Sequence, residues 1–282
     1  MSKRPRIVFL IPIASPRRAK NWHLACALFK RTLSSIFNSS SENYCLVAAG
    51  HELPDFQLPQ DPRLKFLSLD HPLPPLENGY YPAAVKDKLI KLGEAWNYAK
   101  STWNPDYVMK VDWDDLVSCR LVEWLVSAED EAGYLIRHGW VWRSGSPYVV
   151  QRTEQFDRVC GSCLIIRSDL ADRTGPFLTH VEGVVLDEPG LRFAASDQYS
   201  LIPGSPIGTL LLNDSHQRYS AQFRYLGYQL PTVPFSAALC RLCHGNNAGD
   251  QSLGTQTMRM VLGRIRRTRL VTPSLKREFM LG

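Results

Sequence analysis

The sequence predicts an α/β domain built on a mainly parallel β-sheet with helices on its faces. Two observations carry this prediction. Short apolar runs rich in β-branched residues alternate with segments of helical periodicity over the first 111 residues, which is typical of βαβ units. With 282 residues, of which 44% are apolar, the chain can also bury one large core.

The apolar runs that end in Gly, Pro, Asp or a charged residue are the predicted strands. They cover residues 6–13, 44–49, 64–69, 107–111 and 161–167, with a further one at 231–238. Helical spacing predicts helices over 22–36 and 88–100, the second with Leu89, Leu92, Trp96 and Ala99 on one face. A Pro-rich loop is expected over 71–82, and a helical turn over 194–202.

The net charge of +6 is concentrated near the C-terminus. From residue 249 onward there are seven Lys and Arg residues against two acidic ones. We therefore expect a main domain over residues 1–249 and a basic, mostly helical tail over 250–282, whose helix spans 250–270. A nucleic-acid-binding domain would carry basic patches on its main fold as well, so the charge argues against that class. The tail helix is compatible with contact with an anionic membrane surface or with docking on its own domain.

The sequence favours a cytoplasmic location. No apolar run reaches the roughly 18–20 residues needed to span a bilayer. The apolar opening at residues 7–13 is followed at once by Arg17, Arg18 and Lys20, where a signal peptide would have its cleavage site, so we interpret it as a buried strand. Seven cysteines, an odd number, suit free thiols in a reducing compartment. Peripheral contact of the tail with the inner face of the membrane stays open.

The strongest candidate for chemistry is the acidic segment Asp112-Trp113-Asp114-Asp115. It follows a predicted strand directly, and ligands of α/β sheets bind at the carboxyl ends of strands. Three carboxylates in four residues repel one another unless they bind a cation or raise their pKa values. Mg²⁺ and Mn²⁺ prefer such oxygen ligands. The alternative is a solvated turn that caps the next helix.

The segment at residues 106–118, DYVMKVDWDDLVS, resembles the D-x-D segment of GT-A glycosyltransferases, most closely the family-two-like bacterial type. The order of strands and helices before it is similar as well. The resemblance implies a GT-A, Rossmann-like fold, a nucleotide-sugar donor and a Mn²⁺ or Mg²⁺ cofactor. Asp112 would then contact the donor ribose and the metal, and Asp114 would ligate the metal. The acidic residue that meets the nucleobase in the family has no direct counterpart here, and Glu52 is the candidate substitute.

Four further residues acquire candidate roles from the resemblance. Lys86 and Lys88 would approach the donor diphosphate, although they also suit a solvated helix face. Asp197 would be the base that deprotonates the acceptor hydroxyl in an inverting transfer, or simply a carboxylate near a helix start. His244 would be a third metal ligand, or a structural histidine. The acceptor would be a glycan or a lipid-linked molecule.

Two other classes compete with a glycosyltransferase. A nucleotidyltransferase-type enzyme also uses paired carboxylates and metal, but the chain has no Gly-rich phosphate loop. The pairs Cys160-x-x-Cys163 and Cys240-x-x-Cys243 would suit four-thiolate zinc in a non-catalytic binding protein. The 76 residues between these pairs exceed the spacing of zinc ribbons, and buried Cys often serves as a small apolar residue.

Overall fold

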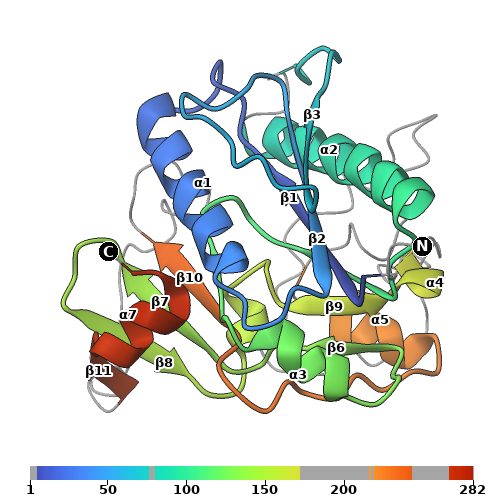
Figure 1. Cartoon of the computed structure of the whole chain (residues 1–282), viewed down its shortest axis with the longest axis vertical. Helices are drawn as coiled ribbons and strands as arrows, with labels where there is room; N and C mark the ends of the chain where they lie inside the picture. Colours follow the sequence, from blue (N-terminus) through green and yellow to red (C-terminus); the bar gives the residue numbers. More distant parts are fainter. Residues whose placement is uncertain (1–4, 76–79, 172–215, 217–218, 243–266, 282) are drawn as a thin grey trace.

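The computed structural model describes residues 5–75, 80–171, 216, 219–242 and 267–281. The fold is α/β, as predicted, but it contains two sheets (Figure 1). The first sheet has six strands in the order β3-β2-β1-β4-β9-β6. Its strands are β1 (Ile7–Pro12), β2 (Tyr44–Gly50), β3 (Leu64–Ser68), β4 (Tyr107–Lys110), β6 (Gly133–Leu135) and β9 (Leu164–Arg167).

The first four strands run parallel. Strand β1 pairs with β2 on one side and with β4 on the other, and β3 extends the sheet beyond β2. Strands β9 and β6 then add to β4 in antiparallel register. The chain therefore moves outward from β1 to β3 and returns on the other side of β1. This reversal creates a topological switch point between β1 and β4, the place where open α/β sheets bind ligands.

Two long helices cover the first sheet. Helix α1 (Trp22–Phe37) begins after Asn21, whose side-chain oxygen accepts a 2.9 Å hydrogen bond from the amide of Leu24. Helix α2 (Tyr80–Thr102) packs on β1 and β2, and Figure 1 shows it across these strands from α1. The predicted apolar face of α2 is buried. The helix begins earlier than predicted, inside the expected Pro-rich loop, because Pro82 lies in its first turn, where a missing amide costs nothing.

The second sheet has five strands in the order β11-β8-β7-β10-β5, and the sequence did not predict it. Its strands are β5 (Leu116–Val117), β7 (Gly139–Arg143), β8 (Tyr148–Arg152), β10 (Ala238–Leu242) and β11 (Thr268–Leu270). Strand β10 begins where the predicted strand at 231–238 was to end. The shorter helices are α3 (Leu121–Ser127), η1 (Phe156–Arg158), α4 (Ser168–Ala171), α5 (Tyr219–Tyr225) and α7 (Pro273–Phe279).

The described part of the C-terminal segment belongs to this second sheet. Residues 268–270 were predicted as the end of a basic helix, but they form strand β11, which pairs with β8. Helix α7 follows, with Pro273 at its start and Thr272 as its cap. Phe279 of α7 is fully buried beside Trp142 and Leu239. Of the predicted helix, residues 250–266 lie outside the described residues. No helix in the described ranges is long and apolar enough to cross a membrane.

Candidate active site at the acidic turn

The acidic segment forms a tight turn that joins the two sheets. Strand β4 of the first sheet ends at Lys110, and strand β5 of the second begins at Leu116. The turn is closed by a 2.9 Å hydrogen bond from the Asp115 amide to the Asp112 carbonyl. It therefore lies at the carboxyl end of β4, beside the switch point, where the sequence predicted a site.

Three neighbours fix the backbone of this turn. Ser162, which precedes β9, accepts a 2.8 Å hydrogen bond from the Asp112 amide through its hydroxyl oxygen. Thr32 on α1 donates from its hydroxyl to the Trp113 carbonyl at 2.8 Å. The guanidinium of Arg241, on β10, donates from Nε to the Asp114 carbonyl. The carboxylates are therefore held on a backbone anchored by both sheets and by α1.

The carboxyl group of Asp115 is buried behind the turn. Its Oδ2 accepts hydrogen bonds from the hydroxyl of Ser162 at 2.7 Å and from the thiol of Cys160 at 3.1 Å. Burial, together with the charges of Asp114 and Asp112, raises the pKa of Asp115 to about 7. Asp114 is also buried, at 4% exposure. The turn thus holds two buried carboxyl groups close to that of Asp112.

Asp112 is the most accessible of the three acidic residues. Its carboxylate, 26% exposed, forms an ion pair with the ammonium of Lys88, which is 32% exposed. Burial disfavours the charged carboxylate, but Lys88 and Lys110 outweigh this effect and lower the pKa of Asp112. Burial likewise disfavours the ammonium of Lys88, yet the carboxylates of the turn raise its pKa. Both groups therefore carry their full charge near neutral pH.

A buried arginine lies behind the acidic turn. Arg241 is 0% exposed, and its Nη2 donates to the Leu28 carbonyl at 2.8 Å and to the Thr32 hydroxyl at 3.3 Å. Burial lowers its pKa to about 10, although Asp114 and Asp115 favour the charged form. Arg241 is therefore charged at neutral pH, and its charge offsets part of the repulsion among the carboxylates.

The structure brings together only some of the residues predicted for the site. Asp112, Asp114 and Lys88 meet at the turn, whereas Lys86 lies half-buried two residues before Lys88 on α2. Glu52 is exposed just after β2, at the same edge of the sheet. The predicted base Asp197 and the predicted metal ligand His244 lie outside the described residues.

Three residues at the turn were missed from the sequence. Ser162 links the Asp112 amide to the Asp115 carboxyl group. Lys110, on β4, is buried, lies 5.1 Å from the ring centroid of Tyr219 and acts electrostatically on Asp112. His216 interacts electrostatically with Asp112, and burial lowers the pKa of His216 to about 4. No motif in the sequence marks this residue. The available signal was the position of Lys110 two residues before Asp112, because residues two apart in an extended segment point to the same side.

The donor atoms of the turn fit a hard divalent cation. Asp112 and Asp114 offer carboxylate oxygens, the ligand type that Mg²⁺ and Mn²⁺ prefer. Burial, together with the charges of Asp114 and Asp112, raises the pKa of Asp115, and a bound cation would favour the charged form of all three carboxylates. Gly161 also leaves room for the Asp112 carboxylate, since a Cβ on Gly161 would lie 2.7 Å from Asp112 Oδ2. In this structure one oxygen of Asp112 is used by Lys88, so a bound ion would share or replace that partner.

The cysteine pairs meet only in part. Cys160 and Cys240, one from each pair, lie with Asp115 in a buried group whose ligand atoms are within 4.8 Å of one another. Cys163 instead donates weakly to the Asp157 carbonyl at 3.9 Å, and Cys243 lies outside the described residues. The hydrogen bond with Cys160 lowers the pKa of the Cys240 thiol, but burial raises this pKa to about 12. Among the described residues, the four-thiolate zinc site considered from the sequence is not formed.

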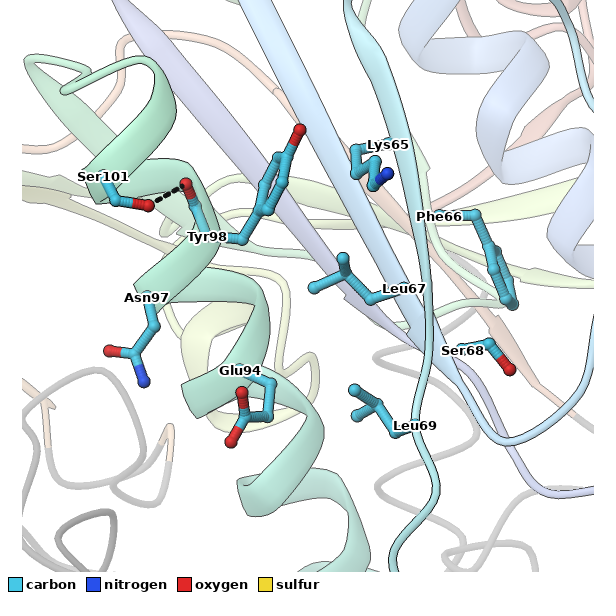
Figure 2. Close-up of a pocket in the computed structure, with 9 residues that line it drawn as sticks. All are labelled: Lys65, Phe66, Leu67, Ser68, Leu69, Glu94, Asn97, Tyr98 and Ser101. Atoms are coloured by element: carbon cyan, nitrogen blue, oxygen red, sulfur yellow. Dashed lines mark hydrogen bonds between the residues drawn. The ribbon is translucent and has the colours of Figure 1, made fainter.

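Two surface grooves lie away from the acidic turn. The larger, of about 550 Å³, runs between β3 and the outer side of α2, and Figure 2 shows Tyr98 and Leu67 facing each other across it. The smaller, of about 350 Å³, lies on the second sheet and is lined by Trp140 and Phe235. Neither groove is lined by the carboxylates at Asp112, Asp114 or Asp115. The chemistry of the turn and the shape of these grooves therefore point to different places, and the turn is the better candidate because it concentrates charge.

No known protein family matches the sequence, and no curated protein is significantly similar to it. Solved structures that are similar in part include the two that follow. The 1–349 fragment of S. aureus TarS gives a TM-score of 0.41 at 10% identity, over 84% of this chain and 60% of that one. A candidate nucleotide-diphospho-sugar transferase from Desulfovibrio desulfuricans G20 gives 0.34 at 10% identity, over 93% and 95%. This chain thus spans about three fifths of the TarS fragment.

Proposed function

We propose that this chain is a glycosyltransferase that transfers a sugar from a nucleotide-diphosphate donor to an acceptor hydroxyl. One observation carries the proposal. Asp112, Asp114 and Asp115 lie on a rigid turn at the carboxyl end of β4, beside the switch point of the sheet, and α2 brings Lys88 to them. A diphosphate with a divalent cation matches this mixture of clustered carboxylates and one accessible ammonium. The resemblance of residues 106–118 to the GT-A segment supports the same reading.

Asp112 and Asp114 would hold a Mn²⁺ or Mg²⁺ ion, with His244 as a further ligand. When bound, the ion would supply Lewis-acid stabilisation of the charge that develops on the leaving nucleoside diphosphate. The chain's own part is to position the two carboxylates, through Ser162 and Arg241, before the donor binds. Preorganised oxygen ligands keep the cost of ordering the site low when the donor arrives.

Lys88 would exchange partners when the donor binds. In the structure it pairs with Asp112, and both side chains are partly exposed. Because both side chains still reach solvent, a diphosphate that brings its own negative charge can take the place of Asp112 beside Lys88. Lys88 would then donate to a phosphate oxygen, and Asp112 would become available to the ion. Lys86 would be a second contact with the diphosphate, and Glu52 would contact the nucleoside.

The proposal also covers the acceptor side. Asp197 would accept the proton of the acceptor hydroxyl as the new bond forms, which gives inversion at the anomeric carbon without a covalent enzyme intermediate. The acceptor would be a glycan or a lipid-linked molecule, and the basic residues after 249 would favour an anionic membrane surface. These assignments depend on residues beyond the acidic turn and are tested separately from it.

Binding of nucleoside diphosphates by calorimetry, with and without Mn²⁺, tests the proposal. We expect at least one nucleoside diphosphate to bind only in the presence of Mn²⁺, and Asp114→Asn to abolish that binding. The matched control is Asp169→Asn, since Asp169 is 54% exposed and pairs with Arg167 away from the turn. Metal-independent binding, or unchanged binding by Asp114→Asn, would contradict the proposal.

Turnover distinguishes a glycosyltransferase from a nucleotidyltransferase. The substrate is the nucleotide sugar that corresponds to the bound nucleoside diphosphate. The proposed reaction releases the nucleoside diphosphate and transfers the sugar to the acceptor. Release of the sugar 1-phosphate from that donor, with the nucleoside monophosphate passed to an acceptor or to water, would instead favour nucleotidyl transfer. Asp197→Asn should slow sugar transfer while leaving donor affinity nearly unchanged, because a base acts on the acceptor; loss of donor binding would refute this role.

A further inference from the structure

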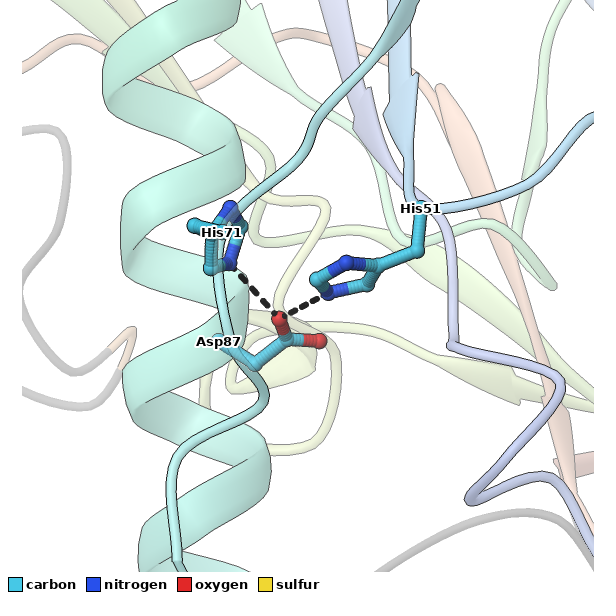
Figure 3. Close-up of side chains that lie close together, drawn as sticks. All are labelled: His51, His71 and Asp87. Carbon is cyan, nitrogen blue, oxygen red and sulfur yellow. Dashed lines mark hydrogen bonds and ion pairs between the residues drawn. The ribbon is translucent and has the colours of Figure 1, made fainter.

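A second group of possible metal ligands lies at the carboxyl end of the first sheet. It consists of His51, which follows β2, His71, which follows β3, and Asp87 on α2. Nε2 of His51 lies 2.7 Å from Oδ1 of Asp87, and Nε2 of His71 lies 3.2 Å from the same oxygen. Figure 3 shows both imidazole rings directed at this one carboxylate oxygen. Residues far apart in the sequence therefore aim three ligand atoms at one point.

The spacing of these atoms suits a small divalent ion. Zn²⁺ binds imidazole nitrogen and carboxylate oxygen at about 2.0–2.2 Å, so its ligand atoms are roughly 3.3 Å apart in a tetrahedral site. To reach that separation, the His71–Asp87 distance of 3.2 Å hardly changes, and the His51–Asp87 distance of 2.7 Å widens by about half an ångström. The three ligand atoms all lie within 4.8 Å of one another, and a water molecule would complete four-coordination.

A buried lysine orients the carboxylate. Lys91, which is 1% exposed, pairs with Oδ2 of Asp87 and donates to the Ile13 carbonyl at 2.7 Å. This contact uses the oxygen that faces away from the histidines and leaves Oδ1 directed at them. Metal-binding carboxylates are commonly held in this way by a hydrogen bond to their second oxygen. The contact also places Asp87 where a rotation of its side chain is costly.

The partial burial of the group favours ligation over a solvated contact. The side chains of His51, His71 and Asp87 are 12%, 20% and 8% exposed. Each imidazole can release the Nε2 proton and keep the Nδ1 proton, the tautomer that binds a metal through Nε2. Two neutral imidazoles and one carboxylate form a ligand set for a borderline cation rather than for Mg²⁺, which prefers oxygen ligands alone.

We infer that His51, His71 and Asp87 form a binding site for one borderline divalent cation of the Zn²⁺ class, separate from the oxygen-only site proposed at the acidic turn. The bound ion would fasten the segment after β3 to the end of β2 and to α2. Asp87 directly precedes Lys88, whose ammonium pairs with Asp112. The ion would thereby also fix the part of α2 that presents Lys88 to the acidic turn. The inference does not depend on the proposed transfer reaction.

Binding of Zn²⁺ to the metal-stripped full-length protein, measured by equilibrium dialysis, tests the inference. We expect wild type to bind one Zn²⁺, and His71→Gln and Asp87→Asn each to weaken this binding by about tenfold or more. His71→Gln is the more informative variant, because His71 lies in a segment outside helices and strands and is the most exposed of the three ligands. Circular dichroism should show that it remains folded. A wild-type protein that binds no Zn²⁺, or a His71→Gln variant that binds it as wild type does, would overturn the inference.

Three controls locate the ion. His23→Gln removes an imidazole that is 88% exposed and paired with Asp55, and it should leave Zn²⁺ binding unchanged. Cys160→Ser should also leave it unchanged, because it alters the acidic turn. Co²⁺ provides a spectroscopic check: ligation by two imidazoles and a carboxylate gives d–d bands without sulfur-to-cobalt charge transfer. Strong charge transfer that disappears in Cys160→Ser would place the ion at Asp115, Cys160 and Cys240 and contradict the inference.

Discussion

Replacing Asp115 by Asn should change the pH dependence of stability in one direction. The pKa of Asp115 is raised by burial, and by Asp114 and Asp112, from 3.8 to about 7 in the folded protein. Between these values the folded state keeps a proton that the unfolded state has lost. The free energy of unfolding therefore falls as the pH rises through this window. At about 1.4 kcal/mol per pKa unit, the full decline amounts to at most about 4 kcal/mol.

Asp115→Asn abolishes this decline, because the amide does not titrate. We expect the unfolding free energy of the variant, relative to wild type, to increase steadily between about pH 4 and pH 7 and then to level off. The loss of good acceptor geometry for Ser162 and Cys160 adds a constant penalty that does not depend on pH, since neither donor titrates in this range. The slope of the difference, rather than its absolute value, carries the prediction.

Urea unfolding in the presence of a chelator, followed by tryptophan fluorescence across this pH range, gives the required free energies. The control is Asp169→Asn, whose exposed ion pair with Arg167 should give little or no such slope. A difference between Asp115→Asn and wild type that stays constant from about pH 4 to pH 7 would refute the reasoning. Asp115 would then be charged in the folded protein, with its charge neutralised by Arg241 or Lys88.

Further variants test other parts of the account. Lys88→Gln should bind Mn²⁺ alone several-fold more tightly, because Asp112 loses its ion-pair partner. The same variant should bind a nucleoside diphosphate in the presence of Mn²⁺ more weakly. Calorimetry that shows both affinities changing in the same direction would contradict the proposed exchange. Gly161→Ala places a Cβ 2.7 Å from Asp112 Oδ2 and should weaken Mn²⁺-dependent nucleotide binding without unfolding the protein, whereas unchanged binding would mean that this carboxylate orientation is unimportant. Phe279→Ala should cost about 3–5 kcal/mol in urea unfolding, because Phe279 is 0% exposed in the second core; a loss below 1 kcal/mol, against the roughly 3 expected at minimum, would show that α7 does not contribute to the fold.

Apart from β6, the strands of the first sheet were predictable because they have local signatures. Strands β1, β2 and β4 are fully buried on both faces, so each appears in the sequence as an uninterrupted apolar run. The second sheet lacks this signal, since β7 and β8 are partly exposed and β5 has only two residues. Strand β11 was taken for a helix because arginines and apolar residues follow one another around it. Its structure is instead decided by pairing with β8, more than a hundred residues earlier.

The same distinction applies to the candidate site. Asp112, Asp114 and Asp115 are contiguous, so the sequence displays them together. Ser162, just before β9, and Arg241, on β10, are distant in the sequence and reach the turn only through the packing of the two sheets. The group formed by His51, His71 and Asp87 was missed for a related reason. His51 follows β2, His71 follows β3, and Asp87 lies in α2. Only the parallel pairing of β2 with β3 brings the two histidines to the same edge of the sheet.

The central claim is that the carboxylates of Asp112 and Asp114 bind a divalent ion together with a nucleoside diphosphate. Crystals grown with Mn²⁺ and the nucleoside diphosphate that binds in solution allow the ion to be located by its anomalous scattering. The account predicts a Mn²⁺ peak bonded to carboxylate oxygens of both residues and to the diphosphate, with Lys88 turned from Asp112 toward a phosphate oxygen. A diphosphate bound elsewhere, or a Lys88–Asp112 pair that persists beside a bound nucleotide, would contradict it.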